Sequence, residues 1–425
     1  MLRFAPSPTG DMDIGTLRVA LLNYLVATQR SEPFLVRIED IDKERNIEGK
    51  DTEFMQILEK FAIRHDQVYH QSEHRNIHLT LAVRLLEEEK AFVCTCPVND
   101  PETDPCRGAC MEADASVYTR LKESGEPFVV RIRKPQGNII FHDLIQGDVV
   151  TAPDAIESFV ILKADATPTQ DFATACDDML SNISLIIRQE EQLLHTPKQI
   201  HIKQELGYQE ETQYAHLPAL LNEEGETLSG KDETFWLKWF FEQGFIPDAL
   251  INYLILLGSS NAPGEIFYFP EAHEWFSLGD LSTSPVRFEL DRLRAINREH
   301  LRMMDDKRLS TLFGFADADI GKLAKVYLEE ASTINELAAR IRPILAPKRF
   351  EGEWEASMRQ IQHALIDAPM FETFDELKTY VAEETGLKGE ALLTPLRLLL
   401  TGDKEGPELD RIYPCIRSYL LEVIS

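Results

Sequence analysis

The N-terminal stretch constrains the fold more than any other part of the chain. Leu2–Ala5 is a short, largely apolar run, a Pro/Gly turn follows at Pro6–Gly10, and an apolar pattern at helical spacing begins at Ile14. This order predicts a short strand that leads into the N-terminus of a helix. Such a terminus presents free N–H groups and the positive end of the helix dipole, so it suits a phosphate group. Gly10 and Gly15 would let a ligand approach the backbone.

Strands alternate with helices up to about residue 85. Helical spacing occupies Ile14–Thr28 and Thr52–Phe61, and Pro33–Ile38 is a strand candidate that runs into Glu39. This alternation predicts a parallel α/β sheet. Ligands of such sheets bind at the carboxyl ends of the strands. Arg3 and Glu39 both lie at predicted strand ends, so they are candidate site residues.

The rest of the chain divides into segments of different character. Residues 86–150 contain a Cys-, Pro- and Asp-rich stretch and then strand candidates, so we expect an insertion between the two halves of the α/β domain, 1–85 and 151–225. Residues 301–425 show mainly helical spacing. They are therefore expected to form an all-helical region.

Bulk composition limits the class of protein. The length of 425 residues suggests roughly three domains, and a hydrophobic fraction of 44% suits a soluble globular protein. No apolar run reaches the roughly 18 residues of a membrane span, and the N-terminus has no secretory signal pattern. We therefore expect a cytoplasmic protein that does not bind a membrane. The net charge of -28 excludes nucleic-acid binding over the whole surface but permits a local basic groove.

Four of the six cysteines lie within 17 residues. Cys94-x-Cys96 is followed, after nine residues, by Cys106-x-x-x-Cys110 in a stretch rich in turn formers. Four sulfurs at short spacing suit a closed, tetrahedral and therefore structural zinc site. The alternative, four free thiols in an exposed loop, would be a liability in a reducing compartment. We predict close to one Zn²⁺ per chain.

Together these features resemble bacterial glutamyl-tRNA synthetase, a class I aminoacyl-tRNA synthetase. The resemblance covers nearly the whole chain, and the cysteine spacing fits the zinc site of the family's insertion that binds the tRNA acceptor end. The segments that carry the resemblance are Arg3–Gly10, Arg37–Arg45, Tyr69–Arg75, Pro168–Thr169, Asp177–Asp178, Ile187–Arg188, Thr196–Gln199, Thr227–Lys231 and Pro395–Leu409.

The resemblance implies a Rossmann-like catalytic domain with a zinc-bearing insertion. It also implies a stem-contact region at 226–300 and an all-α anticodon-binding region at 301–425. Glutamyl-queuosine tRNA(Asp) synthetase shares the zinc site but lacks an anticodon-binding domain. The helical C-terminal region of this chain therefore argues against that relative. Glutaminyl-tRNA synthetases carry β-barrels in this region, and the sequence contains no run of short strands there.

The resemblance further implies a two-step reaction. Glutamate and ATP would give glutamyl-adenylate and pyrophosphate, and the glutamyl group would then pass to the 3′ end of tRNA. The implied partners are glutamate, ATP with Mg²⁺, and tRNA-Glu, tRNA-Gln or both. A monomer is the family expectation.

The implied site combines three sets of residues. The glutamate pocket would use two arginines for carboxylate and an acidic residue for the ammonium group; its members are Arg3, Ala5, Ser7, Glu39, Gln170, Thr174 and Arg188. ATP would contact Pro8, Thr9, Gly10, Gly15, Glu190, Leu228 and Lys231. The catalytic set is Asp13, Gly15, Thr16, Ser229 and Lys231.

Two ATP-handling motifs depart from the family pattern. Asp13 and Thr16 replace the histidines of His-Ile-Gly-His, and Gly230 replaces the second lysine of Lys-Met-Ser-Lys, with Lys231 one residue away. An ionised carboxylate donates no hydrogen bond and would repel phosphate by about 1–4 kcal/mol at about 4 Å. A bound Mg²⁺ would turn that repulsion into attraction.

These departures leave two interpretations of the sequence. The first is a glutamate–tRNA ligase. The second is a catalytically impaired paralogue that binds tRNA as a regulatory or binding module. ATP–pyrophosphate exchange with glutamate, with and without tRNA, distinguishes them.

Overall fold

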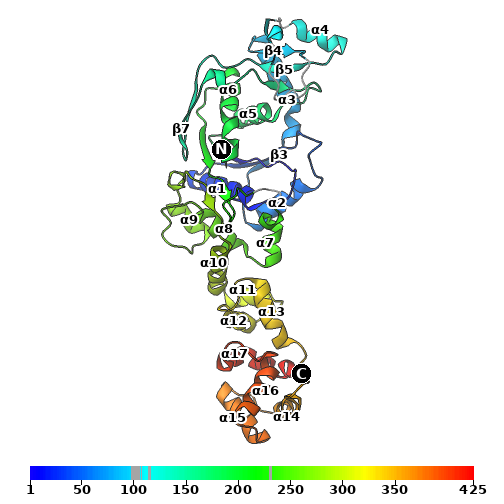
Figure 1. The fold of residues 1–425 in the computed structure, drawn as a ribbon, viewed down its shortest axis with the longest axis vertical. Coiled ribbons are helices and arrows are strands. Elements are labelled where there is room, and N and C mark those ends of the chain that lie inside the picture. The colour runs from blue at the N-terminus through cyan, green and yellow to red at the C-terminus, as the bar shows by residue number, and fades with distance from the viewer. Residues whose placement is uncertain (97–105, 107, 113–115, 229–231) are drawn as a thin grey trace. The chain divides into compact units, whose positions relative to one another are not determined.

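The computed structural model describes residues 1–96, 106, 108–112, 116–228 and 232–425. The described chain forms two compact units, shown in Figure 1. The first unit contains residues 1–238 and 251–289, and the second contains residues 239–250 and 290–425. Helices α7 (Leu237–Gln243) and α8 (Pro247–Leu256) include the points at which the chain passes between them.

A seven-stranded sheet, ordered β3-β2-β1-β9-β10-β6-β7, forms the centre of the first unit. Neighbouring strands are parallel except in the β6–β7 hairpin. The central strands are apolar and buried, as expected for a parallel sheet covered on both faces. The strand bounds are β1 (Leu2–Phe4), β2 (Phe34–Ile38), β3 (Gln67–His70), β6 (Ile139–Asp143), β7 (Gly147–Thr151), β9 (Leu185–Gln189) and β10 (Gln213–Leu217).

Helices connect and cover these strands. Helix α1 contacts β1, β2 and β9, and a second core forms where α3, α5 and α6 meet a smaller sheet. Leu85, Ile161, Phe172 and Ile202 contribute to this core. The helix bounds are α1 (Ile14–Arg30), α2 (Lys50–Lys60), α3 (Arg75–Glu87), α4 (Ser116–Ser124), α5 (Gln170–Leu180), α6 (Thr196–Glu205) and α9 (Phe269–Trp275).

The smaller sheet is antiparallel and has the order β4-β5-β8. Its strands are β4 (Ala91–Cys94), β5 (Val129–Ile132) and β8 (Val160–Leu162). Strands β6 and β7 lie largely within residues 86–150 but extend the main sheet, whereas β8 lies outside this range and joins the smaller sheet. A third sheet pairs β11 (Leu220–Leu221) with β12 (Val286–Arg287).

The second unit is helical throughout the residues described beyond 289. The helices pack through buried apolar side chains. Examples from five different helices are Leu293, Leu323, Leu337, Leu377 and Leu396. The helices are α10 (Leu290–Met303), α11 (Asp306–Thr311), α12 (Asp319–Val326), α13 (Ile334–Leu345), α14 (Glu355–Ile366), α15 (Phe374–Thr385), α16 (Glu390–Thr401), α17 (Leu409–Ile416) and α18 (Leu420–Val423).

The predicted fold class is confirmed: a mainly parallel α/β unit precedes an all-helical region. The predicted elements at 14–28, 33–38 and 52–61 correspond to α1, β2 and α2. None of the described helices is long and apolar enough to cross a membrane. The division into five segments is finer than the two compact units, and it stays a prediction.

Candidate active site

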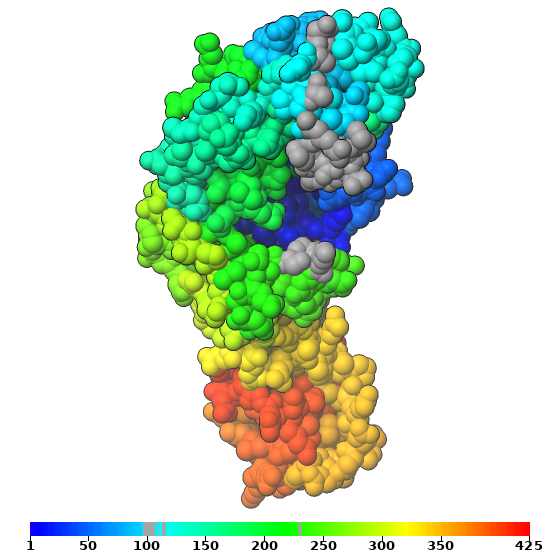
Figure 2. All heavy atoms as spheres, turned by 45° about the horizontal axis from the view of Figure 1, so that its top comes forward, coloured from blue at the N-terminus to red at the C-terminus, as the bar shows by residue number. Residues whose placement is uncertain are grey.

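A polar cavity of about 620 Å³ lies at the carboxyl ends of β1, β2 and β9. Its walls come from the turn after β1, the start of α1, Glu39, α5 and the segment after β9. Figure 2 shows the corresponding hollow, with the dark-blue N-terminal segment at its floor. The cavity therefore lies where a parallel α/β sheet places its ligands.

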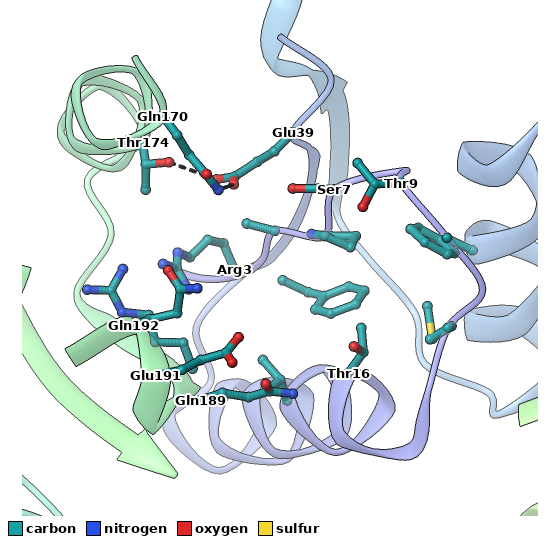
Figure 3. Close-up of a pocket in the computed structure, with 18 of the residues that line it drawn as sticks. Arg3, Ser7, Thr9, Thr16, Glu39, Gln170, Thr174, Gln189, Glu191 and Gln192 are labelled. Atoms are coloured by element: carbon teal, nitrogen blue, oxygen red, sulfur yellow. Dashed lines mark hydrogen bonds between the residues drawn. The ribbon is translucent and has the colours of Figure 1, made fainter. Parts of the chain in front are cut away.

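The carboxylate of Glu39 is held firmly on one side of the cavity (Figure 3). Its Oε1 accepts hydrogen bonds from Thr174 Oγ1 at 2.9 Å and Arg37 Nη2 at 3.0 Å, and its Oε2 accepts one from Gln170 Nε2 at 3.2 Å. These contacts fix the carboxylate in place. They place an anion where an ammonium group could bind.

A buried network of ion pairs, centred on Asp178, holds the arginine that contacts Glu39. Asp178, which is 1% exposed, accepts hydrogen bonds from Arg3 Nε at 3.2 Å and Arg37 Nη1 at 2.7 Å. Burial favours a raised pKa for Asp178, but the two arginine charges outweigh it and hold the pKa well below its usual value. Asp178 therefore stays ionised and orients Arg3, which lines the cavity.

Arg188 differs from the other buried arginines of the site because its partners are neutral. It donates from Nε to His216 Nε2 (3.0 Å), from Nη1 to Gln199 Oε1 (2.9 Å) and from Nη2 to Thr196 Oγ1 (2.5 Å). Within the described chain, no carboxylate lies at ion-pair distance from Arg188. Burial, together with the charge of Arg3, lowers the pKa of Arg188 to about 10. A buried cation at a cavity wall, with Asp178 and Asp171 nearby but not at ion-pair distance, favours binding of an anionic ligand.

The start of α1 shows a role for Asp13 that the sequence did not indicate. Asp13 Oδ1 accepts a hydrogen bond from the backbone N–H of Thr16 at 2.6 Å, so Asp13 is the N-cap of α1. Its carboxylate therefore occupies one of the N–H groups of the helix start. A Cβ at Gly15 would lie 2.8 Å from Gln189 Nε2, so glycine permits this close contact.

The structure brings most of the predicted site residues together. Glu190, which was predicted to contact ATP, accepts a hydrogen bond from the backbone N–H of Ala219 at 3.2 Å. The predicted residues Ser229 and Lys231 lie outside the described residues. Pro8, Gly15, Glu190 and Leu228 do not line the cavity. Predicted residues that do line it are Arg3, Ala5, Ser7, Thr9, Gly10, Asp13, Thr16, Glu39, Gln170, Thr174 and Arg188.

Sequence reasoning missed several lining residues of the segment around η4 (Glu190–His195) and of α6. Glu191, Gln192, His195 and Gln199 all line the cavity, and Figure 3 shows Glu191 and Gln192 beside Arg3. For Glu191 and Gln192, the position directly after the end of β9 was the available signal. We expect these polar side chains to contribute to ligand selection.

The four cysteines of the predicted metal site lie together at the end of β4. All four Sγ atoms lie within 4.8 Å of one another, and Cys96 Sγ is 3.6 Å from Cys110 Sγ and 4.0 Å from Cys106 Sγ. Zinc–sulfur bonds of about 2.3 Å in a tetrahedron require sulfurs about 3.8 Å apart. Burial raises the pKa of Cys94 to about 12, so a cation would be needed to hold it as a thiolate. The residues fit zinc.

A second cluster joins α3 to α5 through Asp177. Asp177 Oδ1 contacts His74 Nδ1 at 2.9 Å and His78 Nε2 at 2.8 Å, while Oδ2 accepts from Gln71 Nε2 at 2.8 Å. A metal on His78 Nε2 would require Nδ1–H to donate. That buried Nδ1 has no partner among the described residues. We therefore interpret the cluster as a hydrogen-bonded support.

Comparison with known proteins agrees with the fold and the site. Residues 1–303 match the family described as tRNA synthetases class I (E and Q), catalytic domain. Glutamate–tRNA ligase 2 of a Sulfurovum species is 60% identical over 429 residues, and glutamate–tRNA ligase 1 of a Nitratiruptor species is 47% identical over 434 residues. Both alignments cover all of each chain.

Solved structures show the same fold. The crystal structure of a glutamate tRNA ligase from Elizabethkingia meningosepticum, in complex with its amino acid, superposes with a TM-score of 0.82 at 24% identity. The superposition covers 99% of this chain and 97% of the other. The family match over residues 1–303, on a parallel sheet with its cavity at the strand ends, identifies a class I aminoacyl-tRNA synthetase.

Within that class, the chain belongs to the tRNA synthetase family for glutamate and glutamine (E and Q). The resemblance to glutamyl-tRNA synthetase, which the sequence motifs indicated, is confirmed. None of the comparisons favours the impaired paralogue.

Proposed function

We propose that the protein is an ATP-dependent glutamate–tRNA ligase. The observation that carries this proposal is that one cavity contains both the fixed carboxylate of Glu39 and the buried cation of Arg188, whose hydrogen-bond partners are neutral. Glutamate carries one ammonium group and two carboxylates, so it matches a cavity that offers an anion and buried cations. Full-length identity to proteins named glutamate–tRNA ligase supports the same conclusion.

The first step joins glutamate to AMP. An oxygen of the α-carboxylate forms a bond to the α-phosphorus of ATP, and the bond from that phosphorus to pyrophosphate breaks. Glu39 would hold the ammonium group, and Arg3 and Arg188 would hold carboxylate oxygens. The remaining N–H groups at the start of α1 would face the phosphates, which enter with Mg²⁺.

The second step transfers the glutamyl group to tRNA. A terminal ribose hydroxyl forms an ester bond with the glutamyl carbonyl carbon, AMP leaves, and the hydroxyl proton is lost to a base. Which of tRNA-Glu and tRNA-Gln is charged is part of the proposal to be measured.

The zinc and tRNA assignments complete the proposal. Cys94, Cys96, Cys106 and Cys110 would hold a structural Zn²⁺. The insertion at 86–150 would contact the acceptor end, the region 226–300 the stem, and the helices of 301–425 the anticodon. We propose a cytoplasmic monomer.

ATP–pyrophosphate exchange tests the proposal directly. With tRNA present, glutamate should support exchange, and glutamine should support it at least about 100-fold less well because it lacks the second carboxylate for the two cavity arginines. Charging of purified tRNA-Glu and tRNA-Gln then measures tRNA choice. Measurable tRNA binding without any exchange would overturn the proposal and favour the impaired paralogue.

A further inference from the structure

Two buried residues behind Arg188 form a chain of hydrogen bonds that ends at its guanidinium group. Strand β6 contributes Asp143 and strand β10 contributes His216, and both side chains are fully buried. Asp143 Oδ2 lies 2.6 Å from His216 Nδ1, and His216 Nε2 accepts the Nε–H of Arg188 at 3.0 Å. Neither Asp143 nor His216 lines the cavity.

Asp143 and Arg188, at the two ends of this series of hydrogen bonds, require the same tautomer of His216, with the proton on Nδ1. An ionised aspartate can only accept hydrogen bonds, so Nδ1 must carry a proton toward Asp143. An arginine can only donate, so Nε2 must offer a lone pair toward Arg188. Thr196 Oγ1, 3.0 Å from Nε2, can donate to the same lone pair. Protonation of Nε2 would oppose two of these donors.

The backbone fixes Asp143 equally firmly. Its Oδ1 accepts N–H groups of Ile145 (3.0 Å), Gln146 (2.9 Å) and His216 (3.2 Å). Burial favours a raised pKa for Asp143, but the hydrogen bonds from His216 and the backbone outweigh it and lower the pKa. Asp143 is therefore ionised across the neutral pH range.

The charges around His216 favour its neutral form. Burial lowers its pKa, and the positive charges of Arg188 on β9 and Arg3 on β1 lower it further, whereas Asp143 on β6 opposes them. On its own strand, the Tyr214 ring stacks at 6.5 Å and carries no charge at neutral pH. Because the pKa of His216 is lowered, the ring stays neutral at neutral pH and binds a proton only at a lower pH than an ordinary histidine does.

We infer that Asp143 and His216 are positioning residues that aim the Arg188 guanidinium at the substrate carboxylate, so that protonation of His216 weakens glutamate binding. The inference rests on the proposed function and extends it. It predicts that the KM for glutamate rises with acidification, at a pH below the one at which an ordinary histidine protonates. The carboxylates of free glutamate stay ionised in this range, because the side-chain pKa is about 4.3.

The sharpest variant is Asp143→Asn, which keeps the oxygen that accepts the backbone N–H groups. Its amide would donate toward Nδ1, move the histidine proton to Nε2 and oppose the Arg188 Nε–H. Pyrophosphate exchange with tRNA should show a KM for glutamate raised roughly tenfold or more, with kcat changed less than about threefold. An unchanged KM in a folded variant would overturn the inference.

Substitutions of His216 separate positioning from packing. His216→Gln retains an acceptor for Arg188 and a donor for Asp143, so we expect a KM near that of the natural chain without the rise at acid pH. His216→Leu should raise the KM at every pH. His201→Gln is the matched control, because His201 is also buried but contacts the carbonyl of Arg133 at 2.7 Å. An acid-pH rise that persists in His216→Gln would contradict the inference.

A spectroscopic test does not depend on activity. With ¹⁵N-labelled histidine, the natural chain at pH 7.5 should show His216 protonated at Nδ1, assigned by its absence from His216→Gln. A proton at Nε2 would refute the inference even if glutamate is activated. If the natural chain gives no exchange with glutamate, the proposed function fails, and a proton at Nδ1 that moves in Asp143→Asn would still support the hydrogen-bond chain.

Discussion

At the scale of the residue, Arg188 shows how a binding site departs from the rules of a stable core. Arg37 is also buried but has Asp178 and Glu39 as ion-pair partners, whereas Arg188 has neutral ones. The cost of burying this charge is recovered only when an anion binds. Stability and binding are therefore expected to change in opposite directions when Arg188 is replaced.

Arg188→Gln tests this trade-off. The KM for glutamate should rise by about 100-fold or more because a charge-assisted contact is lost. The melting temperature should stay the same or increase, since a desolvated cation is removed. Arg18→Gln is the control: Arg18 is also buried, donates to the carbonyl of Leu257 at 2.6 Å and does not line the cavity, so it should leave the KM unchanged. A large loss of stability in Arg188→Gln would contradict this account.

Sequence reasoning reached some site residues and not others for a physical reason. Arg3 and Glu39 lie at predicted strand ends, which share one edge of a parallel sheet, whereas only the family resemblance indicated Arg188. Asp143 and His216 could not be assigned to the site, because their contact depends on β6 pairing with β10 across a long stretch of chain. No local pattern encodes that register.

At the scale of the element, helix α1 depends on the cap that Asp13 provides. Asp13→Ala should lower the free energy of unfolding by about 0.5–2 kcal/mol, whereas Asp13→Asn should cost little because asparagine also caps. Urea unfolding measures both. In Asp13→Asn the KM for ATP should fall, because a negative charge near the phosphates is removed. A raised KM for ATP would instead indicate that the carboxylate acts through Mg²⁺.

The β4–β5 element is expected to depend on metal. Metal analysis should find one zinc in the natural chain and none in Cys96→Ser, and hydrogen exchange in β4 and β5 of the variant should accelerate while β1 and β9 remain protected. Cys415→Ser, in the second unit, should keep the zinc. Retention of zinc and of slow exchange in Cys96→Ser would rule out the cysteine site.

Secondary structure was easier to predict than sheet membership. Helical and strand periodicity located α1, β2 and α2 closely. The smaller sheet draws β4 and β5 from the region predicted as an insertion and β8 from the chain that follows it. Segment boundaries drawn from composition therefore do not follow the hydrogen bonding between strands.

At the scale of the whole molecule, acid should destabilise the first unit before the second. Asp143, Asp177 and Asp178 are buried in the first unit, and for each the hydrogen bonds or ion pairs outweigh burial and lower the pKa. Below about pH 4 these aspartates take up protons in the unfolded chain but stay ionised in the folded unit. Each of them therefore lowers the free energy of unfolding by up to about 1.4 kcal/mol per pH unit as the pH falls. The same contribution is fully present at neutral pH.

Urea unfolding between pH 5 and pH 3, followed by hydrogen exchange, measures the two units separately. Protection in β1, β9 and β10 should fall with pH more steeply than protection in α10 to α17. Earlier acid loss in the second unit would contradict the expected distribution of buried carboxylates.

The place of β6 in the main sheet has a consequence for how the chain is made. Strands β6 and β7 leave the ribosome well before β10, yet β10 is the strand that joins them to the rest of the sheet. The nascent β6–β7 hairpin must therefore wait until β10 has been synthesised as far as residue 217, and until then Phe141 lacks the Tyr214 ring against which it packs in the finished unit. Chains stalled between these points would be the ones most in need of a chaperone.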